Sequence, residues 1–383
     1  MKTRLLIVAE NLYGGGVERI LQIVLRNFDF SRYEITLYSS RKETLLPEYY
    51  PTHIKQGYFF ESISEKASLK DRLVCRIINK FKLFIYYNFS PSVFYSFFVK
   101  GKYDVGIAFI EGYATRILSG GPKKMKKIAW VHTDIQKNHW TKIAFRSLVE
   151  ETHSYSVFDA VACVSQCVAE QFDKTFNTKN QIVLYNPIER DRIIKNASVK
   201  VIDLTTMNAG KRIIFSLGRL EPIKGYMRLL HIVERLYNDD RLQPVLFILG
   251  EGKERNVLNH YIITHQMESY VHLIGFKDNP YPYLAQADIY VCSSIAEGYN
   301  TAITEALILG KPVVTTEVSG AREQLGNSEY GIVTDNDEES LYKGLKRMMR
   351  DDVLEYYTEK AQQRGKVYSM ETSMAYIYQL IES

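Results

Sequence analysis

Two acidic residues, Glu297 and Glu305, lie eight positions apart in the segment from Asp288 to Pro312. The segment opens with a short apolar run, from Asp288 to Cys292, that predicts a buried strand. Small and polar residues follow, and apolar residues at helical spacing begin near Thr301. A carboxylate in a turn, beside the free N–H groups of a helix N-terminus, suits an anion that also carries hydroxyl groups, and a nucleotide sugar is such an anion. A buried strand–helix unit with two incidental surface acids is the alternative.

Two cations, Arg219 and Lys224, lie five positions apart between a predicted strand, 213–217, and a predicted helix. Cations at the carboxyl end of a strand and beside a helix N-terminus suit a diphosphate group. Arginine can bind two oxygens at once, whereas lysine acts as a mobile point charge. A solvated charged loop would contain the same residue types. The position of the two cations upstream of the two acids favours a binding site.

Composition bounds the class of protein. The 383 residues are enough for two to three domains with cores of their own, and the formal net charge of +5 is modest. The four cysteines form no C-x-x-C pair, which indicates reduced thiols of a cytosolic protein. The N-terminus runs into a strand without a signal-peptide cleavage site, and no apolar stretch reaches about 18 residues. We therefore expect a cytoplasmic protein.

Strands alternate with helices along most of the chain. One series of apolar strands runs from Leu5–Ala9 to Gln181–Tyr185, and a second runs from Arg212–Leu217 to Pro312–Thr316. This alternation predicts parallel sheets covered by helices on both faces. The polar, lysine-bearing stretch 189–210 between the two series predicts a linker. We expect an α/β protein of two Rossmann-like domains with a cleft between them.

A glycine-rich turn, residues 14–16, joins the first strand to a helix expected from Val17 to about Phe28. The turn is not G-x-G-x-x-G, and no acid follows the next strand where a dinucleotide ribose would need one. We therefore expect no nicotinamide cofactor. A plain tight turn is the alternative to a ligand-binding one.

The pattern S-x-x-E-G-x6-E-A, at residues 294–306, resembles the donor-site signature of retaining GT-B glycosyltransferases of family 4 (glycosyl transferases group 1). The segment GRLEPIKG, residues 218–225, resembles the G-R-L…K-G motif of that family. The resemblance covers most of the second half of the chain. It implies two Rossmann-like domains whose parallel sheets face each other across a cleft: an acceptor-side domain, 1–190, and a nucleotide-sugar-binding domain, 191–366. A C-terminal helix, about 367–383, would pack back on the first domain.

The resemblance also implies roles for individual residues of the second domain. Arg219 and Lys224 would bind the donor diphosphate, Glu297 the hydroxyls of the transferred sugar, and Glu305 the ribose hydroxyls. The other donor-binding positions are Gly218 in the G-R-L…K-G motif, Phe276 and Lys277 at the base, and Tyr299, Asn300 and Thr301 at the phosphates. Many members of the family carry a proline or glycine where this chain has these last three residues, which leaves the identity of the sugar open.

In the first domain the resemblance implies two further contacts. Family members carry a G-G-x-E turn facing the cleft, which corresponds here to Gly15, Gly16 and Glu18. His132 ends a predicted strand, and the matching histidine of the family contacts the donor sugar. A core or surface histidine is the alternative for His132.

A metal site is not expected. Asp335-Asn336-Asp337 is a formal D-x-D triplet, but it directly precedes a predicted helix beginning at Glu338, and helix capping explains it. No Cys/His cluster has the spacing of a zinc site. We expect no cofactor, with the nucleotide sugar acting as substrate.

The segment from Lys66 to Lys102 is basic and aromatic, with Asp71 as its one acid. Apolar residues between Leu73 and Ile85 fall within one arc of a predicted helix, and Lys123–Lys127 adds a second basic cluster. An ordinary helix whose apolar arc faces the core is one interpretation, and an interfacial helix attracted to anionic lipid is the other. Nothing resembles a nucleic-acid recognition motif, so no nucleic-acid partner is expected.

Together these features predict a retaining, metal-independent glycosyltransferase. The resemblance implies transfer of a hexose or N-acetylhexosamine from a nucleotide sugar, a UDP-sugar in the first instance, to a glycan or lipid-linked acceptor in bacterial surface polysaccharide synthesis. The protein would be cytoplasmic, with peripheral contact to the inner face of the cell membrane if the interfacial interpretation holds. A non-hydrolysing UDP-sugar epimerase on the same fold, and a catalytically silent sugar- or lipid-binding partner, are the alternatives.

Overall fold

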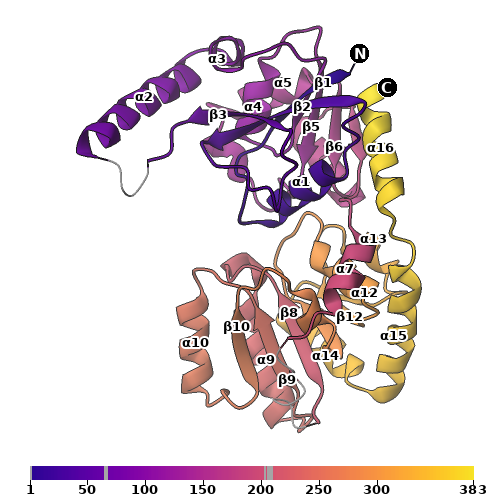
Figure 1. Ribbon diagram of the computed structural model, residues 1–383. Coiled ribbons are helices and arrows are strands. Elements are labelled where there is room, and N and C mark those ends of the chain that lie inside the picture. The colour runs from indigo at the N-terminus through magenta and orange to yellow at the C-terminus, as the bar shows by residue number, and fades with distance from the viewer. Residues whose placement is uncertain (1, 64–67, 202–203, 205–209) are drawn as a thin grey trace. The chain divides into compact units, whose positions relative to one another are not determined.

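The computed structural model describes residues 2–63, 68–201, 204 and 210–383. The chain divides into two compact units. The first comprises Met1–Pro187 together with Glu371–Ser383, and the second comprises Ile188–Met370. Each unit contains one parallel β-sheet with helices packed against it (Figure 1). The predicted α/β class with two Rossmann-like parallel sheets is confirmed.

The sheet of the first unit has the strand order β3-β2-β1-β4-β5-β6-β7, and neighbouring strands pair in parallel. Its strands are β1 (Thr3–Val8), β2 (Tyr33–Arg41), β3 (Lys55–Phe60), β4 (Val105–Ala108), β5 (Lys126–Val131), β6 (Ala160–Cys163) and β7 (Gln181–Val183). The order changes direction at β1. Because crossovers between parallel strands are right-handed, this reversal places the connecting helices on opposite faces of the sheet.

The helices of the first unit include the C-terminal one, α16. They are α1 (Gly16–Arg26), α2 (Leu69–Asn88), α3 (Pro91–Phe98), α4 (Tyr113–Ser119), the 3-10 helix η1 (Trp140–Ile143), α5 (Leu148–Ser156), α6 (Gln166–Phe176) and α16 (Met370–Glu382). Hydrogen bonds near the C-terminal end of α16 hold this helix to the unit. The hydroxyl of Tyr378 accepts from the backbone N–H of Asp29 at 2.8 Å, and Lys126 Nζ donates to the carbonyl of Leu380 at 2.6 Å.

The sheet of the second unit has the order β10-β9-β8-β11-β12-β13, again parallel. Its strands are β8 (Ile213–Leu217), β9 (Val245–Leu249), β10 (Val271–Gly275), β11 (Ile289–Cys292), β12 (Val313–Thr316) and β13 (Ile332–Thr334). The helical elements are α7 (Arg190–Ala197), η2 (Pro222–Lys224), α9 (Tyr226–Asn238), α10 (Arg255–Thr264), α11 (Tyr281–Leu284), α12 (Thr301–Ile308), α13 (Ala321–Leu325), α14 (Glu338–Met348) and α15 (Asp351–Gly365).

The strand order of the second unit reverses between β8 and β11, which are hydrogen-bonded neighbours. Every residue of β9, β11 and β12 is buried, as expected for apolar strands covered on both faces. In open parallel sheets, ligands bind outside the carboxyl ends of the strands at the reversal point. The loops that follow β8 and β11 lie at that point, and they carry the two motifs singled out in the sequence.

The predicted linker 189–210 is partly helical. Its first part forms α7, because Ile193 packs with Ile188, Tyr281 and Ile308 in a small apolar cluster. Residues 202–203 and 205–209 of this stretch lie outside the described residues. In the part of the chain that the structure describes, no helix combines the length and apolar character needed to cross a bilayer.

Helix α2 projects from the first unit (Figure 1), and its apolar arc faces solvent rather than the core. The side chains of Leu73, Ile77 and Phe81 are 59%, 58% and 61% exposed. The interpretation of α2 as an ordinary core-facing helix is therefore wrong. The polar side of α2 packs on the unit instead, where Asn79 bonds to the backbone of Glu61.

Candidate active site

The loops after β8 and β11 approach each other closely in the second unit. Gly225 makes this approach possible, because it begins α9 with a φ of +65° and a Cβ at its position would lie 2.2 Å from the carbonyl oxygen of Ser293. The hydroxyl of Ser293 donates to the carbonyl of Lys224 at 2.9 Å, which joins the loops directly. The residue types of both motifs are thereby brought to one place on the sheet.

Lys224 and Glu297 form an ion pair, with 2.6 Å between Nζ and Oε1. The two side chains are 20% and 13% exposed. The same carboxylate oxygen accepts from the hydroxyl of Ser294 at 2.6 Å and from Nδ2 of Asn300 at 3.2 Å. Oε2 of Glu297 accepts no hydrogen bond from any residue that the structure describes. The carboxylate is therefore held in place while one of its oxygens stays available.

Arg219 is exposed on the same loop as Lys224. Its guanidinium makes no ion pair or hydrogen bond with the described residues, while its neighbour Leu220 is buried and donates its backbone N–H to the carbonyl of Glu251 at 2.8 Å. The fixed backbone thus presents an unpaired guanidinium on the loop that also carries Lys224. Guanidinium groups favour phosphate oxygens, which they can bind in pairs.

Helix α12 begins directly after the acidic turn, and Asn300 caps it. The side-chain oxygen of Asn300 accepts from the backbone N–H of Ala302 at 3.0 Å, and its carbonyl accepts from Nε2 of Gln324 at 2.7 Å. Tyr299 and Thr301, the other residues predicted at the phosphates, are partly buried on either side. The cap leaves the first turn of α12 directed at the loop that contains Glu297.

The predicted ribose- and base-binding residues lie farther along the same edge. Glu305 is buried in α12, only 4% exposed, and its Oε1 accepts from the hydroxyl of Tyr281 at 3.3 Å. Phe276 and Lys277 follow β10, two strands away from β8. Phe276 is 65% exposed, so its ring offers a flat apolar face at this edge.

Arg228 fixes the acidic turn from α9. Its Nε donates to the carbonyl of Ser293 at 2.7 Å, its Nη2 donates to the carbonyl of Ser294 at 2.7 Å, and its Nη1 donates to Asn336 Oδ1 at 3.0 Å. Burial lowers the pKa of this guanidinium from its ordinary value. Arg228 was not among the residues predicted from the sequence. No local spacing could have predicted it, because the residues that it joins are far apart in the chain.

In the triplet Asp335-Asn336-Asp337, the side chains of Asn336 and Asp337 form hydrogen bonds with backbone groups. Asp337 caps α14, and its side chain accepts from the backbone N–H of Ser340 at 2.7 Å, so the capping prediction is confirmed. Nδ2 of Asn336 donates to the carbonyl of Ile295 at 2.8 Å. Among the residues with described positions, no group of three or more His, Cys, Asp or Glu side chains is arranged to hold a metal ion.

In the first unit, His132 follows β5 and is 8% exposed. Its ring stacks on Trp130, with 5.7 Å between centroids, and its backbone N–H donates to Oε2 of the buried Glu111 at 3.0 Å. Burial lowers the pKa of the imidazole to about 3, so the ring is neutral at physiological pH. Its Nε2 is buried and has no partner among the described residues. An unsatisfied buried nitrogen is unusual in a folded protein and calls for an explanation.

The glycine-rich turn joins β1 to α1, as the sequence predicted. Gly15 caps α1, and the side chain of Glu18 folds over it, so that a Cβ at Gly15 would lie 2.3 Å from Glu18 Oε2. Gly16 begins the helix. Glu10, just after β1, was not singled out from the sequence. Burial, with smaller contributions from the charges of Glu18 and Glu111, raises the pKa of Glu10 to about 7.

Comparisons with known proteins agree with this geometry. Residues 204–366 match the family described as glycosyl transferases group 1. Over its whole length the chain superposes on Anabaena HepE in complex with UDP-glucose, with a TM-score of 0.74, 17% identity and 98% of each chain covered. It superposes similarly on WaaG, a glycosyltransferase of lipopolysaccharide biosynthesis, with a TM-score of 0.69, 14% identity and coverage of 99% and 100%. The fold is GT-B.

Curated relatives match over a shorter length. A Campylobacter jejuni protein is 35% identical over 189 residues, 49% of each chain. Its name is N-acetylgalactosamine-N,N'-diacetylbacillosaminyl-diphospho-undecaprenol 4-alpha-N-acetylgalactosaminyltransferase. The lipopolysaccharide core biosynthesis glycosyltransferase LpsE of Rhizobium meliloti is 26% identical over 51% of this chain and 55% of its own. The chain thus matches about half the length of these relatives. Together the matches support a glycosyltransferase with the GT-B fold.

Proposed function

We propose that this protein is a retaining, metal-independent glycosyltransferase. It transfers a hexose or N-acetylhexosamine from a nucleotide sugar, most simply a UDP-sugar, to a glycan or lipid-linked acceptor during synthesis of a bacterial surface polysaccharide. It works in the cytoplasm, at the inner face of the cell membrane. The observation that carries this proposal is the ion pair of Lys224 and Glu297, with the unpaired Arg219 on the loop that also carries Lys224, at the reversal point of a parallel sheet.

The arrangement of charges suits departure of a diphosphate. When the bond between the anomeric carbon and the phosphate oxygen breaks, its electron pair leaves with the phosphate, and negative charge grows on the diphosphate. Arg219 and Lys224 stabilise that charge. The acceptor hydroxyl oxygen attacks the anomeric carbon from the same face, and its proton passes to the leaving phosphate oxygen. The charges on both cations replace those that a metal ion would supply.

Glu297 has two states in this scheme. In one state, which the structure shows, its Oε1 neutralises Lys224. When the diphosphate binds, it competes for the ammonium of Lys224, and the carboxylate becomes free to accept hydrogen bonds from the sugar hydroxyls. Ser294 and Asn300 keep the carboxylate in position throughout. Glu305 accepts from the ribose hydroxyls, and Phe276 and Lys277 bind the base.

The choice of substrates rests on the proteins that this chain resembles. HepE was solved with UDP and with UDP-glucose, which supports a UDP-sugar donor. The Campylobacter jejuni relative is named for an acceptor linked to undecaprenol through a diphosphate, which supports a lipid-linked acceptor. In the first unit, the unpartnered Nε2 of His132 is the proposed acceptor of a hydrogen bond from a donor-sugar hydroxyl.

A thermal-shift panel of nucleotide sugars tests the proposal first. A ligand that binds only the native protein raises its melting temperature, so a UDP-sugar should do so while other nucleotide sugars do not. Incubation of the protein with labelled UDP-sugars and a membrane extract then identifies the reaction. Transfer of label to the extract supports the proposal. Conversion of one UDP-sugar into another would instead identify an epimerase, and binding without either reaction would identify a silent partner.

A further inference from the structure

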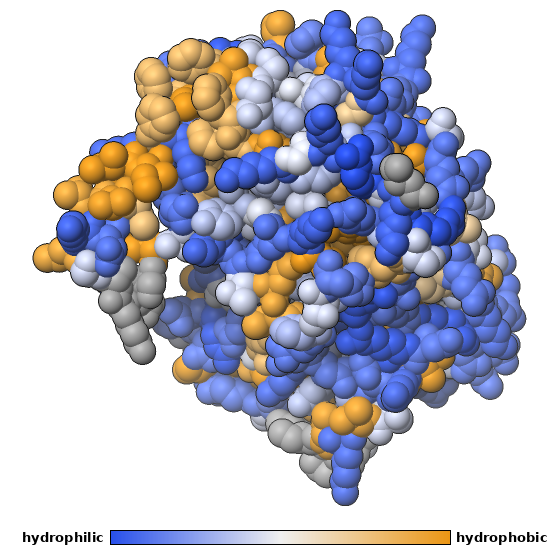
Figure 2. All heavy atoms as spheres, turned by 45° about the horizontal axis from the view of Figure 1, so that its top comes forward, coloured by the Kyte–Doolittle hydropathy of each residue, from blue (hydrophilic) through white to orange (hydrophobic). Residues whose placement is uncertain are grey.

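Helix α2 is amphipathic, but it is turned the opposite way from a helix that covers a core. From Leu69 to Phe84 its large apolar side chains are between 37% and 87% exposed, and these are Leu69, Leu73, Val74, Ile77, Ile78, Phe81, Leu83 and Phe84. Ile85, near the C-terminal end of the helix, is buried. Figure 2 shows apolar side chains gathered at its upper left, over the part of the first unit formed by α2 and α3. Phe89 and Phe97 extend this surface beyond the end of α2, at 45% and 67% exposure.

The polar side of α2 holds the helix to the unit. Asn79 forms two hydrogen bonds with the backbone of Glu61, each 2.9 Å long. Lys82 is only 14% exposed in its side chain and lies near Oε1 of Glu61 and over the ring of Tyr58. Because polar contacts occupy the inner side, the outward position of the apolar side chains is specified by the sequence.

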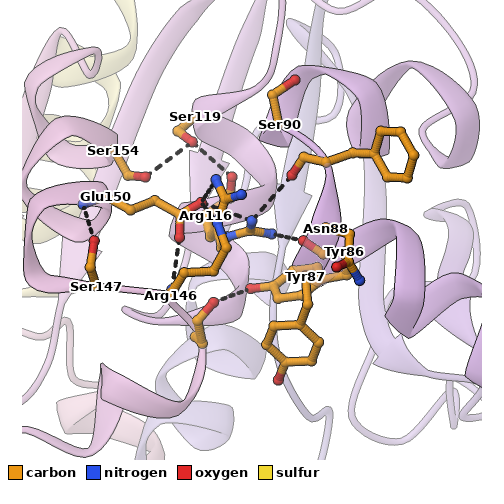
Figure 3. A network of polar contacts seen from close by, with 12 residues as sticks. Tyr86, Tyr87, Asn88, Ser90, Arg116, Ser119, Arg146, Ser147, Glu150 and Ser154 are labelled. Carbon is orange, nitrogen blue, oxygen red and sulfur yellow. Dashed lines mark hydrogen bonds and ion pairs between the residues drawn. The ribbon is translucent and has the colours of Figure 1, made fainter.

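A buried ion pair fixes the C-terminal end of α2 (Figure 3). Arg116 is fully buried and pairs with Glu150 at 2.8 Å. Its guanidinium donates to the carbonyls of Tyr86 at 2.5 Å and Phe89 at 3.4 Å, and it lies 4.2 Å from the ring centroid of Tyr86. A cation that satisfies the last carbonyls of a helix stabilises that end. Helix α2 therefore projects from a rigid base.

The charge around this surface is predominantly positive. The exposed cations of α2 are Lys70, Arg76 and Lys80. Beyond it, the exposed Lys100 and Lys102 follow α3, and the exposed Lys123 and Lys124 lie next to Met125, whose sulfur accepts from the hydroxyl of Tyr95 in α3. Between residues 68 and 102 the one acidic side chain is Asp71. A second copy of the chain that presented this same surface would bring positive charge against positive charge and would be repelled.

We propose that the outward face of α2, together with the exposed side of α3, docks on an anionic lipid bilayer. The 20 residues of α2 lie along the membrane surface over about 30 Å, with the apolar side chains in the headgroup–acyl boundary and the cations on lipid phosphates. This inference rests on the proposed function, because a lipid-linked acceptor is found at such a surface. The inference goes beyond the proposed function, because the sugar-transfer chemistry does not require α2 and α3 to bind a lipid bilayer.

Vesicle co-sedimentation tests the docking. The wild-type chain should bind vesicles of an equimolar mixture of phosphatidylcholine and phosphatidylglycerol, bind phosphatidylcholine alone more weakly, and be released as salt is raised. The variant F81S/F84S should lose about tenfold or more in affinity, because two exposed rings no longer enter the interface. Its control is V257S/I263S, which removes two side chains of similar exposure, 56% and 52%, from α10.

A second pair of variants tests the charges. R76S/K80S should weaken binding to the anionic vesicles about 25-fold, since each cation near an anionic surface contributes about fivefold. Binding of this variant should also depend less on salt. The control K195S/K200S removes two exposed lysines from the second unit and should bind like the wild type. Thermal melting of each variant shows that it is folded.

Three outcomes would overturn the docking proposal. The wild type could fail to bind anionic vesicles, F81S/F84S could bind as tightly as the wild type, or the surface could prove to mediate self-association without vesicle binding. A UDP-sugar thermal shift without vesicles keeps this test separate from the proposed function. All four variants should keep that shift, and its absence from the wild type would count against the donor site instead of the docking surface.

Discussion

The ammonium group of Lys224 lies 2.6 Å from Oε1 of Glu297, so the cation predicted for the diphosphate and the acid predicted for the sugar neutralise each other. The two residues come from loops 73 positions apart in sequence, after neighbouring strands. The pair keeps a positive and a negative group partly buried without an uncompensated charge. In the proposed function, the donor diphosphate would replace Glu297 as the partner of Lys224.

Replacing Lys224 by Ala should lower turnover at least about 100-fold, because a charge-assisted contact to the leaving group is lost in the transition state. The variant should also lose about 1–2 kcal/mol in its free energy of unfolding, since Glu297 is left partly buried without its counter-ion. Steady-state kinetics and urea denaturation measure the two effects. Wild-type turnover in this variant would show that the donor site lies elsewhere.

A double-mutant cycle isolates the pair itself. Glu297→Gln keeps a side chain that can bond to Ser294. The double variant, Lys224→Ala with Glu297→Gln, removes both charges, so that no unpaired charge remains. The loss of stability in the double variant should therefore be smaller than the sum of the two single losses, by about 1 kcal/mol. Additive losses would mean that the contact contributes little to folding.

Arg228→Met should lower kcat/KM about tenfold or more while leaving the charges of the donor site in place. The guanidinium joins the backbone of Ser293 and Ser294 to Asn336, and without it the turn that contains Glu297 is no longer fixed. Arg235→Ala provides the control on the same helix, because Arg235 pairs with an exposed partner, Glu339. Equal kinetics in the two variants would exclude a positioning role for Arg228.

The parallel sheets could be predicted because their central strands are continuous apolar runs, as at Val245–Leu249 and Ile289–Cys292. The two strands that the sequence did not predict, β3 and β13, lie at the edges of their sheets, where strands are shorter or less apolar. Strand β3 reads KQGYFF and is partly exposed, and β13 has only three residues. Helix α7 was missed for a different reason: one apolar side chain, Ile193, secures it through tertiary packing.

The orientation of α2 could not be predicted, because an apolar arc shows that a helix has two sides but not which side meets the domain. That choice is made by Asn79, through its bonds to the backbone of Glu61. Part of the candidate site could likewise be predicted from the sequence, and part could not. Its local motifs could be read from spacing, whereas Arg228 and Glu111 act through contacts with distant segments, and spacing carries no signal of those contacts.

Activity should survive an excess of EDTA. Arg219 and Lys224 supply positive charge at the proposed diphosphate site, and the side chain of Asp337 is used in capping α14. The measurement is transfer of labelled sugar before and after chelation, with magnesium and manganese added back separately. Complete loss that manganese restores would contradict metal independence and would direct attention to Asp335 and Asp337.

Glu10→Gln should stabilise the protein increasingly as pH rises. The carboxyl of Glu10 titrates at about 7 in the folded protein against an ordinary value of 4.5, because burial disfavours its charged form. Between these two values the folded state holds a proton that the unfolded state has lost, so stability falls as pH rises through this window. Above pH 7 the cost is about 2 kcal/mol once solvent screening is included. Glutamine carries no charge, so the variant does not incur the cost of burying a charged carboxylate.

The measurement is the free energy of unfolding of Glu10→Gln minus that of the wild type, taken from pH 4.5 to 8. His132 has its own pH dependence, in the opposite direction, because its lowered pKa makes the folded state lose stability as pH falls below 6.5. It is present in both proteins and cancels in the difference. Glu48→Gln, at an exposed position of the first unit, serves as the control and should give a difference near zero throughout. A flat difference for Glu10→Gln as well would show that Glu10 is ionised in the folded protein at the lower end of this range.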